Sequence, residues 1–212
     1  MVALTMLKFA LEGLLMQILF NSEHSVRDFS IKNPNIFPKT LDSCPFKDCL
    51  TKVSPRKHGY YQRFFISKAF IGILYIRRYK CPVCGKTISF LPIFCIPRYQ
   101  YSGEDIVDSL YRVYHMGVSL SGLIKEFKDI IPSITRRHLN YYRKRIGDNR
   151  KFIQYALNIM SPEFILTGSI PETPQWIKAF LEKVKNLQPL AFFKSFFNIT
   201  GKTFLISQNI IA

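Results

Sequence analysis

Four cysteines constrain this chain more than any other feature of its 212 residues. Two of them are separated by four residues, and the other two, separated by two residues, follow after an interval of thirty-one. This C-x4-C…C-x2-C spacing is typical of a four-thiolate site, because tetrahedral Zn²⁺ takes four such ligands at close quarters. Pro82 helps to fix the second turn, and Gly85 permits the backbone conformation in which amides approach the sulfur atoms. The expected Zn²⁺ ligands are Cys44, Cys49, Cys81 and Cys84.

Two other interpretations of the cysteines stay open beside the metal site. A redox-active C-x-x-C pair of the thioredoxin type precedes a long helix, whereas Gly85 and the strand-like "KTISFLP" follow here. A disulfide framework requires export to an oxidising compartment, and the start of the chain lacks the basic segment and the cleavage site of a signal peptide. The fifth cysteine, Cys95, has apolar neighbours and is expected to be a buried free thiol.

The segment between the cysteine pairs predicts a β-hairpin. Residues 57–67, "KHGYYQRFFIS", and 70–80, "FIGILYIRRYK", are rich in Tyr, Phe and Ile, which favour strands, and a turn is expected within 67–72. "KTISFLP" predicts a third short strand. A hairpin of this length is marginal alone, so a bound metal would stabilise it. Residues 41–100 are therefore expected to form a zinc ribbon.

Residues 101–150 change to helical periodicity. Ser102 is the expected cap of a first helix, and Gly117 is the expected terminating residue. A second helix is expected at 119–127, and Ser133 is the expected cap of a third. In the third helix, Ile134, Leu139, Tyr142 and Ile146 are expected to pack inward. A short helix, a turn and a basic helix predict a helix-turn-helix domain, in which the later helix enters the major groove of DNA.

The charge distribution favours a polyanionic partner. The chain has 30 Lys and Arg against 14 Asp and Glu, a net charge of +16, and residues 44–100 hold eleven basic residues and one acid. Because the positive charge is concentrated in one segment, nucleic acid is favoured over a membrane surface as the partner. Phosphate contacts are expected from the ribbon strand and base contacts from the third helix. The residues expected to contact double-stranded DNA are Arg77, Arg78, Lys80, Thr135, Arg136, Arg137, Asn140, Arg143 and Lys144.

The two ends of the chain are apolar. In residues 1–20 leucines recur at helical spacing, which predicts an amphipathic helix followed by a linker to residue 40. Lys8 and Glu12 argue against a membrane span. Residues 151–212 predict further helices, one of them with Thr173 as its cap and a buried face of Trp176, Ile177, Phe180, Leu181 and Val184. A protein partner could bind through the apolar helices at either end.

Residues 40–150 resemble bacterial proteins that are similar to the N-terminal halves of insertion-sequence transposases. The resemblance lies in "CPFKDC", "HGYYQRFF" and above all "RRYKCPVCGKTISFLPIFCIPRYQYS". It implies Zn²⁺ on the four cysteines and DNA contact through the helix around 135–145. A transposase cuts DNA with three carboxylates on two metal ions, but after Asn149 the chain has only Glu163, Glu172 and Glu182 and no Asp. We therefore expect no catalytic activity.

These observations together predict an α+β protein: a zinc ribbon, a helix-turn-helix domain and a C-terminal helical region. The expected function is cytoplasmic, Zn²⁺-dependent binding of double-stranded DNA. One alternative is a zinc-stabilised protein–protein adaptor whose basic faces meet an acidic partner. Another is a membrane-associated protein anchored by residues 1–20.

Overall fold

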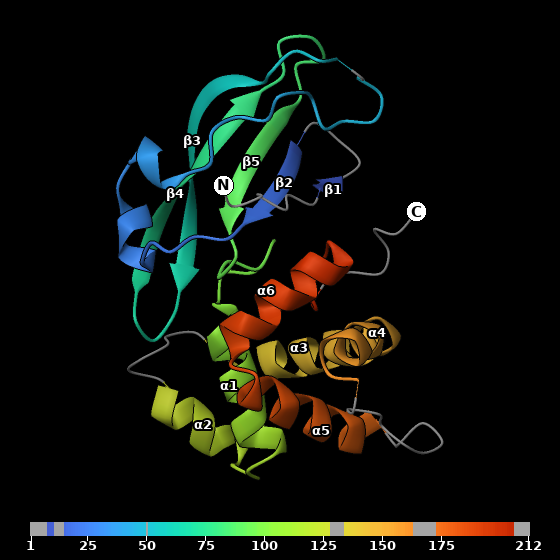
Figure 1. Cartoon of the computed structure of the whole chain (residues 1–212). Helices are drawn as coiled ribbons and strands as arrows, with labels where there is room; N and C mark the ends of the chain where they lie inside the picture. The colour runs from blue at the N-terminus through green and yellow to red at the C-terminus, as the bar shows by residue number, and fades with distance from the viewer. Residues whose placement is uncertain (1–7, 11–14, 50, 128–133, 163–172, 206–212) are drawn as a thin grey trace. The chain divides into compact units, whose positions relative to one another are not determined.

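The computed structural model describes residues 8–10, 15–49, 51–127, 134–162 and 173–205. The fold is α+β, with one five-stranded sheet and a group of α-helices (Figure 1). The chain divides into two compact units. Residues 1–65 and 70–100 form the sheet unit, and residues 66–69 and 101–212 form the helical unit.

The sheet has the strand order β1-β2-β5-β4-β3. Its strands are β1 (Lys8–Ala10), β2 (Leu15–Phe20), β3 (Arg56–Ile66), β4 (Ile71–Lys80) and β5 (Thr87–Pro92). β2 pairs with β5 in parallel, whereas β1–β2 and β4–β5 are antiparallel, so the sheet is mixed. The three strands expected between residues 57 and 92 are thus confirmed, each within two residues at both ends.

The N-terminal segment differs from expectation. The amphipathic helix predicted within residues 1–20 is wrong for the residues that the structure describes, because these form β1 and β2. Residues 16–20 of β2 are each at most 9% exposed, so both faces of the strand are buried. A strand buried on both faces has a nearly continuous apolar sequence, which also satisfies a helical pattern. Pairing with β5 then satisfies its backbone hydrogen-bonding groups.

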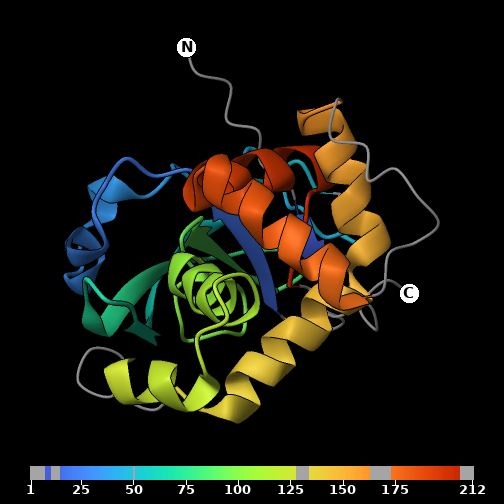
Figure 2. The ribbon, with the colours of Figure 1, turned by 90° about the horizontal axis from the view of Figure 1, so that it is seen from below.

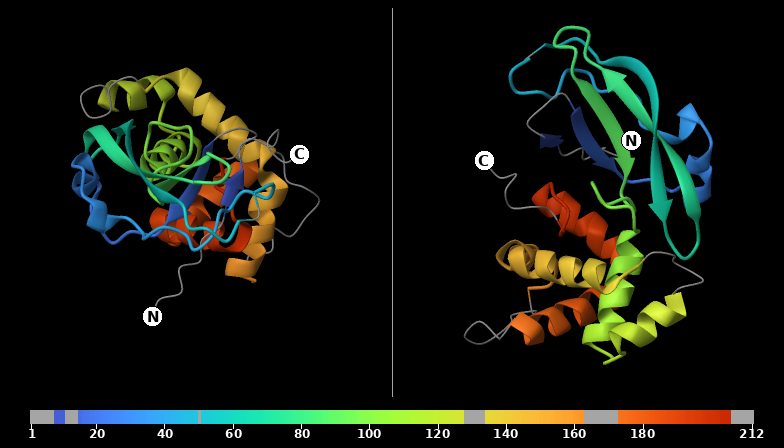
Figure 3. Two further views of the ribbon diagram at one scale, coloured as in Figure 1. Left: turned by 90° about the horizontal axis from the view of Figure 1, so that it is seen from above. Right: turned by 180° about the vertical axis from the view of Figure 1, so that it is seen from behind.

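Aromatic side chains form the core on one side of the sheet. Two 3₁₀-helices, η1 (Val26–Ser30) and η2 (Pro34–Ile36), follow β2, and η1 packs against β4 (Figure 3). The ring of Phe29 lies 5.3 Å from that of Phe37, and the ring of Phe20 lies 5.8 Å from Phe37. Phe20 also meets Phe90 of β5 edge-on at 6.4 Å. These contacts fix the segment after β2 against the sheet.

The helical unit is built around its first helix. Its elements are α1 (Gly103–Tyr114), α2 (Leu120–Phe127), α3 (Arg136–Asp148), α4 (Arg150–Met160), α5 (Thr173–Asn186) and α6 (Pro189–Thr200). α1 contacts α2, α3, α5 and α6 (Figure 2). The expected cap is confirmed, because Ser102 Oγ accepts a hydrogen bond from Asp105 N at 3.0 Å. Gly117 has a φ of +74° after the end of α1, as a terminating glycine requires.

The boundaries of α3 and the face of α5 compare closely with prediction. Thr135 rather than Ser133 is the N-cap of α3, and Ser133 lies outside the described residues. All five residues expected to be buried on α5 are at most 2% exposed. Trp176 and Phe180 stack there with ring centroids 5.5 Å apart. Among the helices that the structure describes, none combines the length and apolar character needed to cross a membrane.

Candidate metal centre

Four sulfur atoms converge at one end of the sheet unit. The Sγ atoms of the four predicted ligands all lie within 4.8 Å of one another. Cys44 Sγ is 3.8 Å from Cys84 Sγ, and Cys49 Sγ is 3.7 Å from Cys81 Sγ. A tetrahedron of sulfurs about 2.3 Å from a central Zn²⁺ has edges of about 3.8 Å, whereas a disulfide bond is only about 2.05 Å long. The spacing therefore fits a metal ion, and all five cysteines are free thiols.

The second cysteine pair forms a tight turn, the second knuckle (residues 81–86), between β4 and β5. Gly85 N donates to Cys81 O at 3.0 Å, and Cys81 N donates to Lys86 O at 3.0 Å. Gly85 has a φ of +71°, which explains why glycine stands there. Burial alone would raise the pKa of the Cys81 thiol, but backbone N–H groups of Cys84 and Val83 outweigh it and lower the pKa to about 7. The turn thus favours a thiolate, the form that binds metal.

The first cysteine pair lies in a loop, the first knuckle (residues 44–49), and none of the residues that the structure describes between 37 and 55 is in a strand. Cys49 N donates to Phe46 O at 3.1 Å, and Cys44 N donates to Thr51 O at 3.2 Å. Burial first and the neighbouring thiols of the cluster second raise the pKa of Cys44 to about 12, although a backbone hydrogen bond from Phe46 opposes them. Four crowded thiols cannot all ionise alone, so a divalent cation is what would stabilise the fully ionised set.

Two features around the cysteines bear on the alternatives. The C-x-x-C pair is followed by β5 instead of a long helix, which disfavours a thioredoxin-type redox pair. Cys95 is fully buried, as expected, and burial raises the pKa of its thiol to about 12. Cys95 also does not belong to the four-sulfur cluster among the described residues. Its thiol is therefore a packing group.

Of the basic residues expected to bind phosphate from the ribbon, Arg77 does not face solvent. It is only 8% exposed, and its guanidinium lies 5.0 Å from the ring of Tyr60 and 5.8 Å from that of Tyr79. Its Nη1 also donates to the Tyr60 hydroxyl at 2.6 Å. Arg77 therefore lies against aromatic rings on the side of β4 that it shares with Tyr79, and its expected phosphate contact stays a prediction. Arg78 is half-buried, and Lys80 is exposed.

Helix α3 presents the expected residues to solvent. Leu139, Tyr142 and Ile146 are at most 3% exposed, so they fix one side of the helix to the unit. The six predicted DNA-contacting residues are all exposed: Arg136, Arg137, Asn140, Arg143 and Lys144 on the other side of the helix, and Thr135 as its N-cap. The structure therefore brings five of the six together on one face, whereas the three on β4 are divided between its two sides.

Sequence reasoning missed an aromatic side chain on the same helix. Tyr141 is 45% exposed, and its hydroxyl accepts a hydrogen bond from Arg145 Nε at 3.2 Å. The four-residue separation of the two residues was the available signal, since such pairs meet on a helix surface. Arg143 is also held, with its guanidinium 5.5 Å from the ring of Tyr114 on α1.

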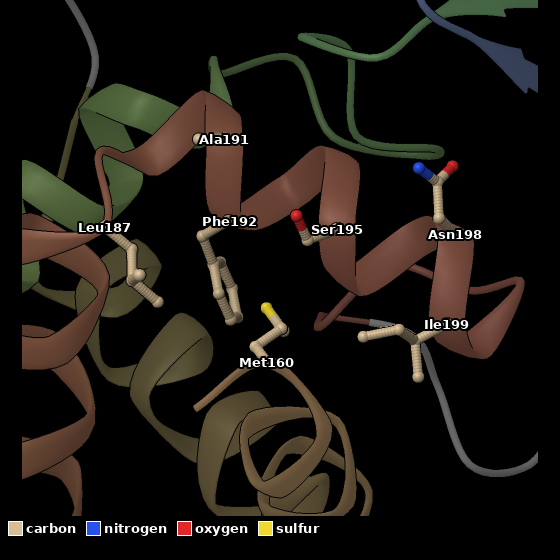
Figure 4. A pocket seen from close by; sticks show the side chains of 7 residues that line it. All are labelled: Met160, Leu187, Ala191, Phe192, Ser195, Asn198 and Ile199. Atoms are coloured by element: carbon tan, nitrogen blue, oxygen red, sulfur yellow. The ribbon is translucent and has the colours of Figure 1, made fainter. Parts of the chain in front are cut away.

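The helical unit contains a hollow of about 340 Å³ between α4 and α6 (Figure 4). Its lining residues are Met160, Leu187, Ala191, Phe192, Ser195, Asn198 and Ile199. The side chains of Met160 and Phe192 point towards each other across it (Figure 4). None of the seven can ionise, so the lining itself provides no general acid or base.

No protein-family model, curated protein or solved structure matches this chain. Functional inference therefore depends on the residues themselves. The four-thiolate cluster and the exposed face of α3 carry it furthest.

Proposed function

We propose that the protein is a Zn²⁺-dependent, non-catalytic, double-stranded-DNA-binding protein of the transposase-like kind that residues 40–150 resemble. Zn²⁺ is bound by the four clustered cysteines and stabilises the sheet unit as a zinc ribbon. Helices α2 and α3 act as a helix-turn-helix, with α3 in the major groove. The observation that carries the proposal is the exposed face of α3, where four cationic side chains and one amide lie opposite a buried apolar stripe.

The chemistry of this face suits the reading of base edges. Arg136 and Asn140 are one helical turn apart, and both are exposed. An arginine can donate two hydrogen bonds to guanine, and an asparagine can pair in the same way with adenine. Arg143 and Lys144 lie one turn further along and suit phosphate contacts. α3 has 13 residues and is about 20 Å long, which suits a groove about 12 Å wide.

In this proposal the bound metal stabilises the small sheet unit by holding the two knuckles together. The first knuckle has no strand of its own, so its position depends on the metal and on contacts with the second knuckle. Ligand binding then contributes folding free energy directly. A cytoplasmic location agrees with this role, because thiols stay reduced there and can bind metal.

The experiment that tests this proposal compares a preferred DNA site with random DNA. A site is first selected from a library of random duplexes with the Zn²⁺-loaded full chain. Arg136→Ala and Asn140→Ala should each weaken binding to that site by about 1–3 kcal/mol, and binding to random duplexes much less, because a bidentate base contact is lost. Lys178→Ala, an exposed charge on α5, is the matched control and should leave the preference unchanged.

Two outcomes would reject parts of the proposal. If the wild-type chain binds no duplex even at low salt, DNA binding is wrong. If Arg136→Ala and Asn140→Ala weaken binding to all sequences equally, α3 contacts phosphates and does not read bases.

The second candidate function is a zinc-stabilised adaptor that binds an acidic protein through its basic faces. One observation favours it: Tyr155 and Ile159 on α4 are 57% and 50% exposed, and Leu190 on α6 is 40% exposed. Large apolar side chains on a surface mark sites of protein contact when they gather there. The same titration decides between the two functions, because an adaptor has no preferred duplex.

A further inference from the structure

The end of the sheet unit that carries the four clustered cysteines collects exposed cations, of which only Lys80 was among the expected DNA contacts. The hydrogen bond between Tyr60 of β3 and Arg77 of β4 marks where these neighbouring strands lie side by side. Arg56 and Lys57 begin β3, and Lys80 ends β4 opposite Thr87 of β5. The second knuckle follows immediately after Lys80, so the start of β3 and the end of β4 both lie next to the metal ligands.

The first knuckle adds two more cations to this end. Lys47 lies between the two cysteines of the pair, and Lys52 follows Thr51, whose carbonyl accepts from Cys44 N. All five side chains of this set are exposed, and we call them the basic rim: Lys47, Lys52, Arg56, Lys57 and Lys80. None of the ion pairs between described residues involves any of the five.

The acids at this end do not neutralise the rim. Asp42 and Asp48 are the nearby carboxylates in the sequence, and Asp48 forms an ion pair with Lys86. The rim therefore keeps an excess of positive charge. Uniform charge of this kind costs folding stability by self-repulsion, so a surface that retains it is suited to an anionic partner.

We propose that the basic rim is a metal-dependent surface for the phosphate backbone of duplex DNA. This inference rests on the proposed function and names the contact that the sheet unit makes within it. Lysine side chains are flexible point charges, which suits phosphate contact without recognition of sequence. In this proposal the rim, rather than the buried Arg77, is the source of phosphate contacts on this unit.

The metal controls the rim through the two knuckles. Lys47 lies within the first pair of ligands, and Lys80 immediately precedes Cys81 of the second pair. Loss of the metal removes the link through the four sulfur atoms and leaves the first knuckle tied to the second by the exposed ion pair of Asp48 with Lys86, so the fixed arrangement of the rim is weakened. Sequence-independent binding should therefore fall when the metal is removed.

The experiment uses the full Zn²⁺-loaded chain and a random duplex of about 30 base pairs, with anisotropy titrations at several salt concentrations. The variant is Lys47→Ser, Lys57→Ser, Lys80→Ser in one chain. The control removes the same charge elsewhere, with Lys32→Ser, Lys178→Ser, Lys194→Ser, all of them exposed. The rim variant should bind about tenfold or more weakly at 0.1 M salt, and its log–log salt slope should fall by about 2 to 3, since each phosphate contact contributes about 0.9.

A second measurement tests the dependence on metal. A chelator should reduce wild-type affinity to near that of the rim variant, and should change the rim variant by less than about twofold. Trp176 is the only tryptophan and is buried in the helical unit, so its unchanged emission would show that this unit stays folded.

The outcomes separate this inference from the proposed function. Equal losses in the rim and control variants, or equal effects of the chelator on wild type and rim variant, would overturn the rim. A rim effect without any sequence preference would support the rim and reject base reading by α3. If the rim variant and the control bind a preferred site with the same affinity, base reading by α3 is supported and the rim is rejected.

Discussion

Lys86 of the second knuckle forms an ion pair with Asp48 of the first, and its ammonium lies 5.0 Å from the ring of Phe46. This pair joins the two knuckles by a contact that involves no sulfur atom. Its hydrogen bond to Lys86 holds the pKa of Asp48 below its usual value, and the same contact raises the pKa of Lys86. The two knuckles are thus linked by a charge contact as well as by the clustered cysteines.

Asp48→Asn should accelerate the loss of metal to a chelator. The ion pair is exposed, so we expect an effect of at most about fivefold, and only at low salt, because salt screens exposed charges. The measurement is the rate of Zn²⁺ transfer to a colorimetric chelator at 0.05 M and 1 M salt. Asp42→Asn removes an exposed carboxylate two residues before Cys44 and is the control. A difference that persists at 1 M salt would mean that the ion pair is not the cause.

Cys84→Ser should abolish stoichiometric metal binding, whereas Cys95→Ala should preserve it. The first change removes one of four ligands, and the second removes a buried thiol outside the cluster. Elemental analysis of each purified chain gives the metal content, with one Zn²⁺ per chain expected for the wild type. The metal-binding assignment fails if the wild type holds no stoichiometric metal, or if its four clustered thiols are found as disulfides.

Much of this fold follows from local sequence patterns. Strands β3, β4 and β5 have the aromatic and β-branched composition of strands, α1 has its cap at Ser102, and α5 has an apolar face but begins at Thr173, the residue expected to cap it. The cysteine spacing also predicted which four sulfur atoms cluster, because short-range turns position each pair. In all these cases the residues that determine the local structure lie within a few positions of one another in the sequence.

The parts that sequence reasoning missed depend on contacts between distant residues. β2 has a helical apolar pattern, and only its pairing with β5, some seventy residues later, makes it a strand. Arg77 is basic, but its neighbour across the sheet is Tyr60, so its charge lies against aromatic rings. Lys86 and Asp48 meet only because the cysteines bring the knuckles together. None of these partners can be identified from sequence spacing alone.

The position of β2 inside the sheet makes residues 16–20 part of the core. Leu19→Ala should lower the free energy of unfolding by about 2–5 kcal/mol, because the side chain is fully buried. Ile31→Ala removes a similar side chain that is 61% exposed and should cost less than about 0.5 kcal/mol. Urea unfolding followed by far-UV circular dichroism gives both values.

A chain that begins at Asn21 should aggregate, since it exposes the edge of β5. If this truncated chain is soluble and binds metal, the role of β2 in the core is contradicted.

Asp108 links two lysines within the helical unit and should make its stability depend on pH. Its Oδ2 is 2.7 Å from Lys68 Nζ and its Oδ1 is 3.0 Å from Lys185 Nζ. Burial alone would raise the pKa of Asp108, but the hydrogen bonds from the two lysines outweigh burial and lower it. The ionised form is therefore favoured by folding. Its stabilisation is fully present above the unfolded pKa of about 3.9 and is lost as pH falls through the lower, folded pKa.

Asp108→Asn should accordingly destabilise the helical unit by about 1 kcal/mol near pH 7, and this difference from wild type should shrink below about pH 4. The measurement is urea unfolding at pH 7, 5 and 3.5, followed by the emission of Trp176, which lies in the same unit. Glu182→Gln makes the matching change at an exposed carboxylate on α5 and should have little effect at any of these pH values. A difference for Asp108→Asn that is constant down to pH 3.5 would indicate a loss of packing, because Asp108 is the one carboxylate that titrates in the wild type and is missing from the variant.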